Sequence, residues 1–119
     1  MESTEHCINE FMEELGVQVD EATELYRELV KELLNNAKDI NKLLPKKDWP
    51  EIKALVHNVK GISVNYKVLD VYEKALLCDR LLRENDIEDI EVHIKELLQL
   101  IQKSENKIKS YFAKFDIEL

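Results

Sequence analysis

One stretch decides the fold of this chain: Leu55-Val56-His57-Asn58-Val59-Lys60-Gly61-Ile62-Ser63-Val64-Asn65-Tyr66. Its apolar residues recur three and four positions apart, which is the spacing of a buried helix face. This register predicts a helix that runs to about Asn65. His57, Lys60 and Gly61 share its exposed face, because residues three and four apart on a helix are neighbours.

The three exposed residues suit an attached anion. The neutral form of histidine is available near physiological pH, and a neutral imidazole is a nucleophile. Glycine inside a helix costs roughly 1 kcal/mol relative to alanine, which indicates that another group approaches Gly61 closely. Lys60 supplies a positive point charge beside the imidazole. Together they predict a phosphoryl group carried on His57 and supported by Lys60 and Gly61.

The same residues resemble the signature of histidine-containing phosphotransfer (HPt) domains: His57-x-x-Lys60-Gly61-x-Ser63-x-Asn65. Val59 stands where that family usually has leucine. Lys67 stands where a later glycine is common, so the turn after the helix departs from the family pattern. The resemblance covers most of residues 8–112, with a long amphipathic helix before the motif and two after it.

The resemblance implies a phosphorelay intermediate in two-component signal transduction. His57 would accept a phosphoryl group from the aspartate of a response-regulator receiver domain, or from a sensor histidine kinase, and pass it to another receiver. The receiver would supply Mg²⁺ and most catalytic groups, so this chain is expected to bind no cofactor and to be a carrier rather than an enzyme. Lys53, Val64 and Lys67 are the predicted docking residues beside the site.

The composition predicts one cytoplasmic domain over residues 1–119, with a core of about residues 8–112. Only two glycines and two prolines occur in 119 residues, and 45% of the residues are hydrophobic. No apolar run approaches the roughly 20 residues of a membrane span, and the acidic N-terminus lacks the layout of a secretory signal. Cys7 and Cys78 are too few and too far apart for a disulfide framework, so we expect two reduced thiols.

The charge is distributed unevenly along the chain. The net charge of −8 disfavours nucleic acid and anionic membranes as partners. Residues 45–67, however, carry five lysines against Asp48 and Glu51, a net charge of +3 that leaves −11 for the remainder. We predict a basic surface around His57 that faces an acidic site on a partner. The alternative is that these lysines only solvate a helix surface.

The pattern of apolar and capping residues predicts five helices. The expected segments are a short helix ended by Gly16, a long helix from an Asp20 cap to Leu44, a helix from an Asp48 cap to Asn65, a fourth through residues 68–82, and a last helix over residues 87–114 capped by Asn85 or Asp86. The four longer helices should pack as an all-α, antiparallel up-down-up-down four-helix bundle. The short N-terminal helix should cover one end.

The sequence does not predict a metal site or a nucleotide site. His6, His57 and His93 fall on three different predicted helices without ligand spacing, so no metal site is expected. No glycine-rich phosphate loop occurs, so we expect no ATP binding. Two alternatives stay open: a non-catalytic helical interaction module, and the phosphoacceptor domain of a hybrid or chemotaxis-type histidine kinase. We expect a monomer, although an exposed Phe112–Phe115 stretch would support a dimer.

Overall fold

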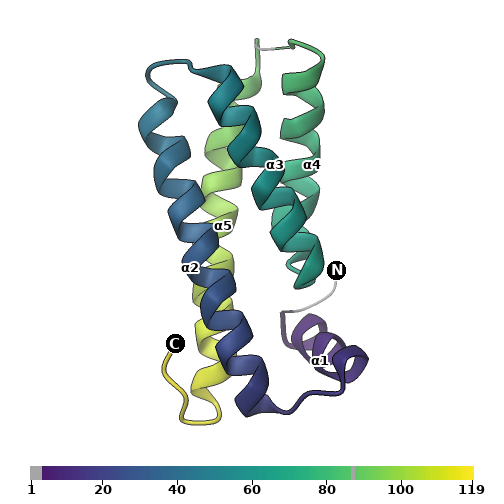
Figure 1. Ribbon diagram of the computed structural model, residues 1–119. Coiled ribbons are helices and arrows are strands. Elements are labelled where there is room, and N and C mark those ends of the chain that lie inside the picture. The colour runs from purple at the N-terminus through teal and green to yellow at the C-terminus, as the bar shows by residue number, and fades with distance from the viewer. Residues whose placement is uncertain (1–3, 87) are drawn as a thin grey trace.

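The computed structural model, which describes residues 4–86 and 88–119, is an all-helical bundle (Figure 1). No strand occurs within these described ranges. The helices are α1 (Thr4–Leu15), α2 (Val19–Leu43), α3 (Trp49–Asn65), α4 (Leu69–Arg83) and α5 (Ile90–Ala113). The molecule is elongated, with extents of 43 × 23 × 20 Å. The all-helical class predicted from the apolar periodicity is therefore confirmed.

The four longer helices pack against one another in turn. Helix α3 contacts α2 and α4, and α5 also contacts α2 and α4, while α1 contacts α5. Each long helix contributes residues with no exposed surface to the shared core, among them Ala22, Ile40, Ile52, Val56, Val59, Val71, Ala75, Ile90, Ile94 and Leu97. Burial of these apolar stripes is the main favourable term in the folding of such a bundle.

Helix α1 lies at the end of the molecule where α3 turns into α4 (Figure 1). The Phe11 ring stacks on Tyr66 with centroids 5.3 Å apart and meets Tyr26 edge-on at 5.1 Å. The Tyr26 hydroxyl donates a hydrogen bond to the carbonyl of Tyr66 at 2.9 Å. These contacts join α1 to α2 and to the end of α3, so the short helix is held by its buried aromatic side chain.

Several helix ends match the predicted ones. Gly16 ends α1 in the left-handed conformation, with φ of 68°, and the amide of Val17 donates to the Met12 carbonyl at 3.0 Å. Asp48 caps α3, because its carboxylate accepts the backbone N–H of Glu51 at 3.4 Å. Helix α3 ends at the predicted residue, Asn65.

The predicted start of α2 is wrong. The capping residue is Gln18, which forms a reciprocal capping box with Glu21, and the helix begins at Val19. In this box the backbone N–H of Gln18 donates to the Glu21 carboxylate at 3.2 Å. Asp20 lies within the first turn instead. Val19, the first residue of the helix, packs against the core.

The predicted cap of the last helix is also wrong. Asn85 has φ of 56°, and the amide of Asp86 donates to the Leu81 carbonyl at 2.9 Å, so both residues close α4. Helix α5 begins only at Ile90, and the predicted start at Ile87 lies outside the described residues. Asparagine tolerates the left-handed conformation that closes a helix, which explains its place here.

Lys67, at the end of α3, has a backbone conformation that favours glycine. Its φ is 59°, and the following amide of Val68 donates to the Ser63 carbonyl at 2.8 Å. A side chain in this conformation costs about 1–2 kcal/mol. The Lys67 ammonium lies 3.2 Å from Glu10 and 3.3 Å from Glu14 on α1. The ion pairs of Lys67, which join α1 to the α3–α4 turn, therefore offset part of the backbone strain at this residue.

None of the helices in the described part of the chain has an apolar stretch of the length that a bilayer crossing requires.

The strain at Lys67 predicts an unusual order of stability. Lys67→Gly and Lys67→Ala both remove the ion pairs, but only glycine relieves the left-handed backbone, so the glycine variant should unfold with a free energy about 1 kcal/mol higher. Urea unfolding followed by circular dichroism measures the difference. At Lys31, an exposed position inside α2, the order should reverse, because glycine is the poorer helix former. Equal stability of the two Lys67 variants would contradict the assigned conformation.

Candidate functional site

His57 projects from the middle of α3, on the face opposite the core. On the inner face, Ile52, Val56 and Val59 have no exposed surface, whereas the His57 side chain is exposed. The imidazole lies between two open hollows, one towards α4 and one towards α2. A partner could therefore reach the ring from either side of α3.

The hollow towards α4, which we call the cationic hollow, measures about 650 Å³. It is lined by Pro50, Lys53, Ala54, His57, Asn58, Lys60, Asp79 and Arg83. Lys53 and Lys60 come from the turns before and after His57, and Arg83 comes from the end of α4. Three cations and one carboxylate thus line the same hollow as the imidazole. The predicted grouping of Lys53 and Lys60 with His57 is found in this hollow.

Asp79 is the anchor of the cationic hollow. Its side chain is buried, with an exposed fraction of 5%, and one of its oxygens, Oδ2, lies 3.0 Å from Lys60 Nζ and 3.3 Å from Arg83 Nε. Burial by itself would raise the pKa of the Asp79 carboxyl. The hydrogen bond from Lys60 and the charges of Lys60, Arg83 and His57 outweigh that effect and hold the pKa below its ordinary value. Asp79 is therefore an ionised, buried carboxylate at neutral pH.

The hollow towards α2, which we call the amide hollow, measures about 630 Å³ and has a different character. Helix α2 contributes Glu32, Asn35 and Asn36, and α3 contributes His57, Asn58, Gly61, Ile62 and Asn65. Among the described residues, no neighbouring atom lies within 4 Å of the place where a Cβ on Gly61 would stand. The fold itself therefore has room for a larger residue at Gly61.

Ser63 serves the fold rather than the exposed site. It has no exposed surface, and its hydroxyl donates a hydrogen bond to the Val59 carbonyl at 2.7 Å. The predicted bond from this hydroxyl to an upstream carbonyl is confirmed. A small side chain bonded to its own helix allows the neighbouring helix to approach, as expected for a residue in register with the core stripe.

Two predicted docking residues lie away from His57. Val64 is 42% exposed, two turns further along α3. Lys67 follows His57 by ten residues, roughly 15 Å along a helix, and its ammonium is held by Glu10 and Glu14. The described residues that line the two hollows include neither of them. Their docking roles stay predictions, whereas Lys53 stands beside the imidazole.

Asp79 and Arg83 on α4 and the amide side chains on α2 were not among the residues predicted for the site. A signal for Asp79 was present, because it follows Ala75 by four residues and precedes Leu82 by three, within the apolar stripe of α4. An ionisable residue in such a stripe needs a charged partner. Which cation would pair with it depends on the packing of α4 on α3, which local spacing does not specify.

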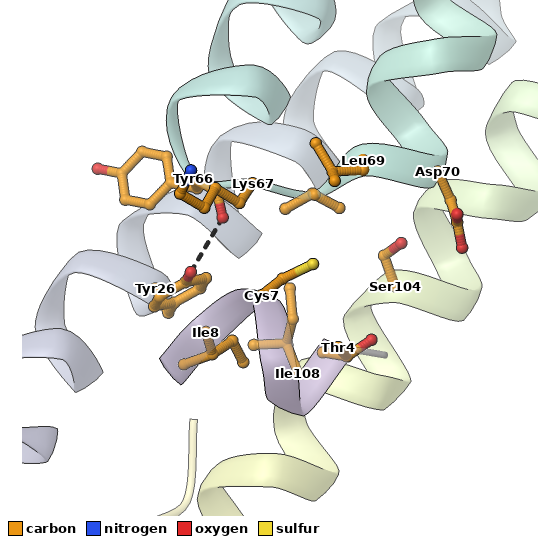
Figure 2. A pocket seen from close by; sticks show the side chains of 11 residues that line it. Thr4, Cys7, Ile8, Tyr26, Tyr66, Lys67, Leu69, Asp70, Ser104 and Ile108 are labelled. Carbon is orange, nitrogen blue, oxygen red and sulfur yellow. Dashed lines mark hydrogen bonds between the residues drawn. The ribbon is translucent and has the colours of Figure 1, made fainter. Parts of the chain in front are cut away.

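Figure 2 shows a separate, partly open pocket between α1, α2, the α3–α4 turn and α5. Tyr26, Tyr66, Cys7 and Ser104 are among the residues that line it. Its volume of about 30 Å³ is the space of one or two water molecules. The pocket is too small for a cofactor, and it lies at the opposite end of α3 from Lys53.

The remaining histidines do not join the site. His6 pairs with Glu10 on α1 at 3.3 Å, and His93 Nδ1 lies 3.3 Å from Lys74 Nζ between α4 and α5. No group of three His, Cys, Asp or Glu side chains within residues 4–86 and 88–119 could hold a metal ion. His57 is the histidine that combines exposure, an adjacent hollow and nearby cations.

Comparisons with known proteins do not place the chain in a family: no family model, no curated protein and no solved structure matches it. The function is therefore argued from the geometry around His57.

The lowered pKa of Asp79 predicts a pH-dependent contribution to stability. Because its folded pKa lies below the unfolded value of about 3.9, the contribution is complete above about pH 4 and is lost as the pH falls through the folded pKa. Asp79→Asn should lower the free energy of unfolding by about 1–3 kcal/mol at pH 7. Below pH 4 the difference in stability between the wild type and the variant should narrow as the pH falls.

Urea unfolding at pH 7 and pH 3 tests this narrowing. Glu73→Gln on the exposed side of α4 is the matched control, and it should change stability little at either pH. A gap between wild type and Asp79→Asn that stayed constant from pH 7 to pH 3 would show that the Asp79 charge does not stabilise the fold.

Proposed function

We propose that this chain is a phosphoryl carrier in a two-component phosphorelay, with His57 as the phosphoacceptor. The observation that carries the proposal is the position of the imidazole. It stands exposed at the middle of a rigid helix, beside a hollow that contains Lys53, Lys60 and Arg83. Phosphoryl transfer depends mainly on positioning and on neutralising charge, and this arrangement supplies both around one nucleophile.

The proposed step is an in-line transfer from an aspartyl phosphate. The lone pair of one imidazole nitrogen forms the N–P bond while the O–P bond breaks and its electron pair returns to the donor carboxylate. The proton on the second ring nitrogen is then released. In the return step, the second ring nitrogen takes up a proton, the aspartate of a second receiver attacks the phosphorus, and the neutral imidazole leaves with the electron pair of the N–P bond. No net oxidation or reduction occurs.

The work is divided between the chain and its partner. The receiver domain would provide Mg²⁺ and most groups that stabilise the transition state, so the chain is a carrier and not an enzyme by itself. Lys60 and Lys53 would offset phosphoryl charge within reach of the ring. The open space over Gly61 would admit the receiver surface. Val64, an exposed apolar residue further along α3, would contact the same surface.

We also propose that α2 to α5 form an antiparallel up-down-up-down four-helix bundle with α1 as an extra helix at one end. The short connections between successive helices and the contacts of each long helix with two others support this arrangement. In such a bundle His57 has a fixed position, because it lies in the middle of α3, away from the helix ends, which fray.

Two other functions fit part of the same geometry. A non-covalent interaction module could use the amide hollow to receive a partner side chain, and a phosphoacceptor domain of a histidine kinase would be labelled directly by an ATP-binding domain. The first alternative predicts binding without labelling. The second predicts labelling by a kinase catalytic domain with ATP but not by a phosphorylated receiver.

The role of His57 is tested by His57→Gln. The substitution should abolish labelling by a ³²P-phosphorylated receiver while the helical circular dichroism stays unchanged, because the side chain is exposed and contributes little to the core. The wild-type label should be acid-labile and alkali-stable, as expected for phosphohistidine. His93→Gln is the matched control and should retain the label. A label that persists in His57→Gln would assign the phosphoacceptor elsewhere.

The role of Gly61 is tested by Gly61→Ala, which should separate stability from function. Because the added methyl group meets no neighbouring atom of the described residues, the variant should be more stable by up to about 1 kcal/mol. Transfer from a receiver should nevertheless slow by about tenfold or more, since the methyl group occupies space that the partner needs. Ser110→Ala on α5 should leave transfer unchanged. Wild-type transfer rates in Gly61→Ala would show that no partner approaches this face closely.

A further inference from the structure

The cations beside His57 are already bound to a carboxylate of the protein. Lys60 Nζ and Arg83 Nε both contact Asp79 Oδ2, at 3.0 and 3.3 Å. The Lys60 side chain is 23% exposed and that of Arg83 is 56% exposed, whereas Asp79 is buried. The two cations can therefore turn towards the solvent and the imidazole, but the carboxylate stays fixed beneath them.

A phosphoryl group on His57 would bring close to two further negative charges to the same hollow. It would need Lys60 and Arg83 as partners, because these cations line the cationic hollow with the imidazole. Asp79 would then lose part of its own ion pairing and would repel the phosphoryl oxygens. In a partly buried environment such charge interactions are stronger than in water.

Resting on the function proposed above, we propose that Asp79 shortens the lifetime of the phosphoryl group on His57 by competing with it for Lys60 and Arg83. Asp79 is thus a regulating residue that favours the onward transfer of the group and does not touch the reacting atoms. The phosphoryl group is therefore less stable on His57 than it would be with the same cations and no Asp79. This suits a carrier, which must pass the phosphoryl group on.

The chemistry of phosphohistidine hydrolysis also predicts that Asp79 shortens the half-life. In hydrolysis a water oxygen binds phosphorus, the N–P bond breaks, and the imidazole leaves with the electron pair and takes up a proton. A nearby carboxylate favours the protonated ring and so makes it a better leaving group. The same carboxylate draws the cations away from the phosphoryl oxygens. Both effects shorten the half-life of phosphohistidine.

The experiment measures the half-life of phosphohistidine in the full chain. Wild type and Asp79→Asn are labelled with potassium phosphoramidate, whose P–N bond breaks to release ammonia as the bond to the ring nitrogen forms. The label is followed by ³¹P NMR, and the signal of His57→Gln is subtracted so that only His57 is counted. Asp79→Asn should lengthen the half-life about three- to tenfold. A half-life equal to that of the wild type would overturn the proposal.

Two controls separate charge from structure. Asp79→Glu, which keeps the charge, should retain a half-life near that of the wild type. Glu73→Gln removes a charge from the exposed side of α4 and should also have no effect. A lengthened half-life in Asp79→Glu, or in Glu73→Gln, would overturn the assignment to the Asp79 charge.

The competition itself is tested through the cations. In a Lys60→Gln background, the increase in half-life caused by Asp79→Asn should shrink by at least half. Only Arg83 would then be freed from Asp79 to bind the phosphoryl group. An undiminished increase would overturn the competition mechanism. Arg83→Gln alone should shorten the half-life, and this variant keeps the test decisive if Asp79→Asn fails to fold, since the arginine is mostly exposed. An unchanged half-life in Arg83→Gln would contradict the proposal.

Incubation with receiver domains distinguishes failure of this proposal from failure of the carrier function. If the label passes between receivers and His57 but Asp79→Asn has the wild-type half-life, the carrier function stands and the role of Asp79 is wrong. If Asp79→Asn lengthens the half-life but no receiver exchanges phosphate with the chain, the charge competition is real and the relay function is wrong. Absence of a His57 label from both phosphoramidate and receivers would overturn both.

Discussion

The burial of one face of α3 is the constraint on which the rest of the structure depends. Ile52, Val56 and Val59 must lie in the core between the neighbouring helices, because exposing them would forfeit the burial that holds the bundle together. Once that face is buried, the helical period places His57 and Gly61 outside. The exposure of the candidate site is therefore a consequence of the packing that stabilises the fold.

The same packing explains how much of the site could be predicted. Lys53, His57 and Lys60 lie on one helix, so their proximity follows from helical spacing and was predicted correctly. Asp79 and Arg83 come from α4, and their approach to His57 depends on the rotation and register of α4 against α3. These are tertiary properties that a local pattern does not specify. The sequence marks Asp79 as an unusual ionisable residue in an apolar stripe, but not its partners.

Helix ends follow a similar rule. Gly16 and Asp48 were predicted correctly because each has one strong local preference, for the left-handed conformation and for accepting an exposed amide. Asn85 suits both the end of one helix and the start of the next. It closes α4, whose last buried residue is Leu82, and α5 with its own buried residues begins at Ile90. The choice between two local preferences is made by the core.

The two hollows beside His57 divide the surroundings of the imidazole by charge. Lys53, Lys60 and Arg83 lie towards α4, while Glu32 and two asparagines lie towards α2. An anion attached to the ring is favoured on the first side and disfavoured on the second. A partner surface can approach most closely on the second side, since Gly61, which has open space over its backbone, lies there. In the proposed function, this asymmetry would place the attached phosphoryl group and the approaching partner on different sides of one exposed side chain. Neither the charge pattern of α3 alone nor its spacing would provide that separation.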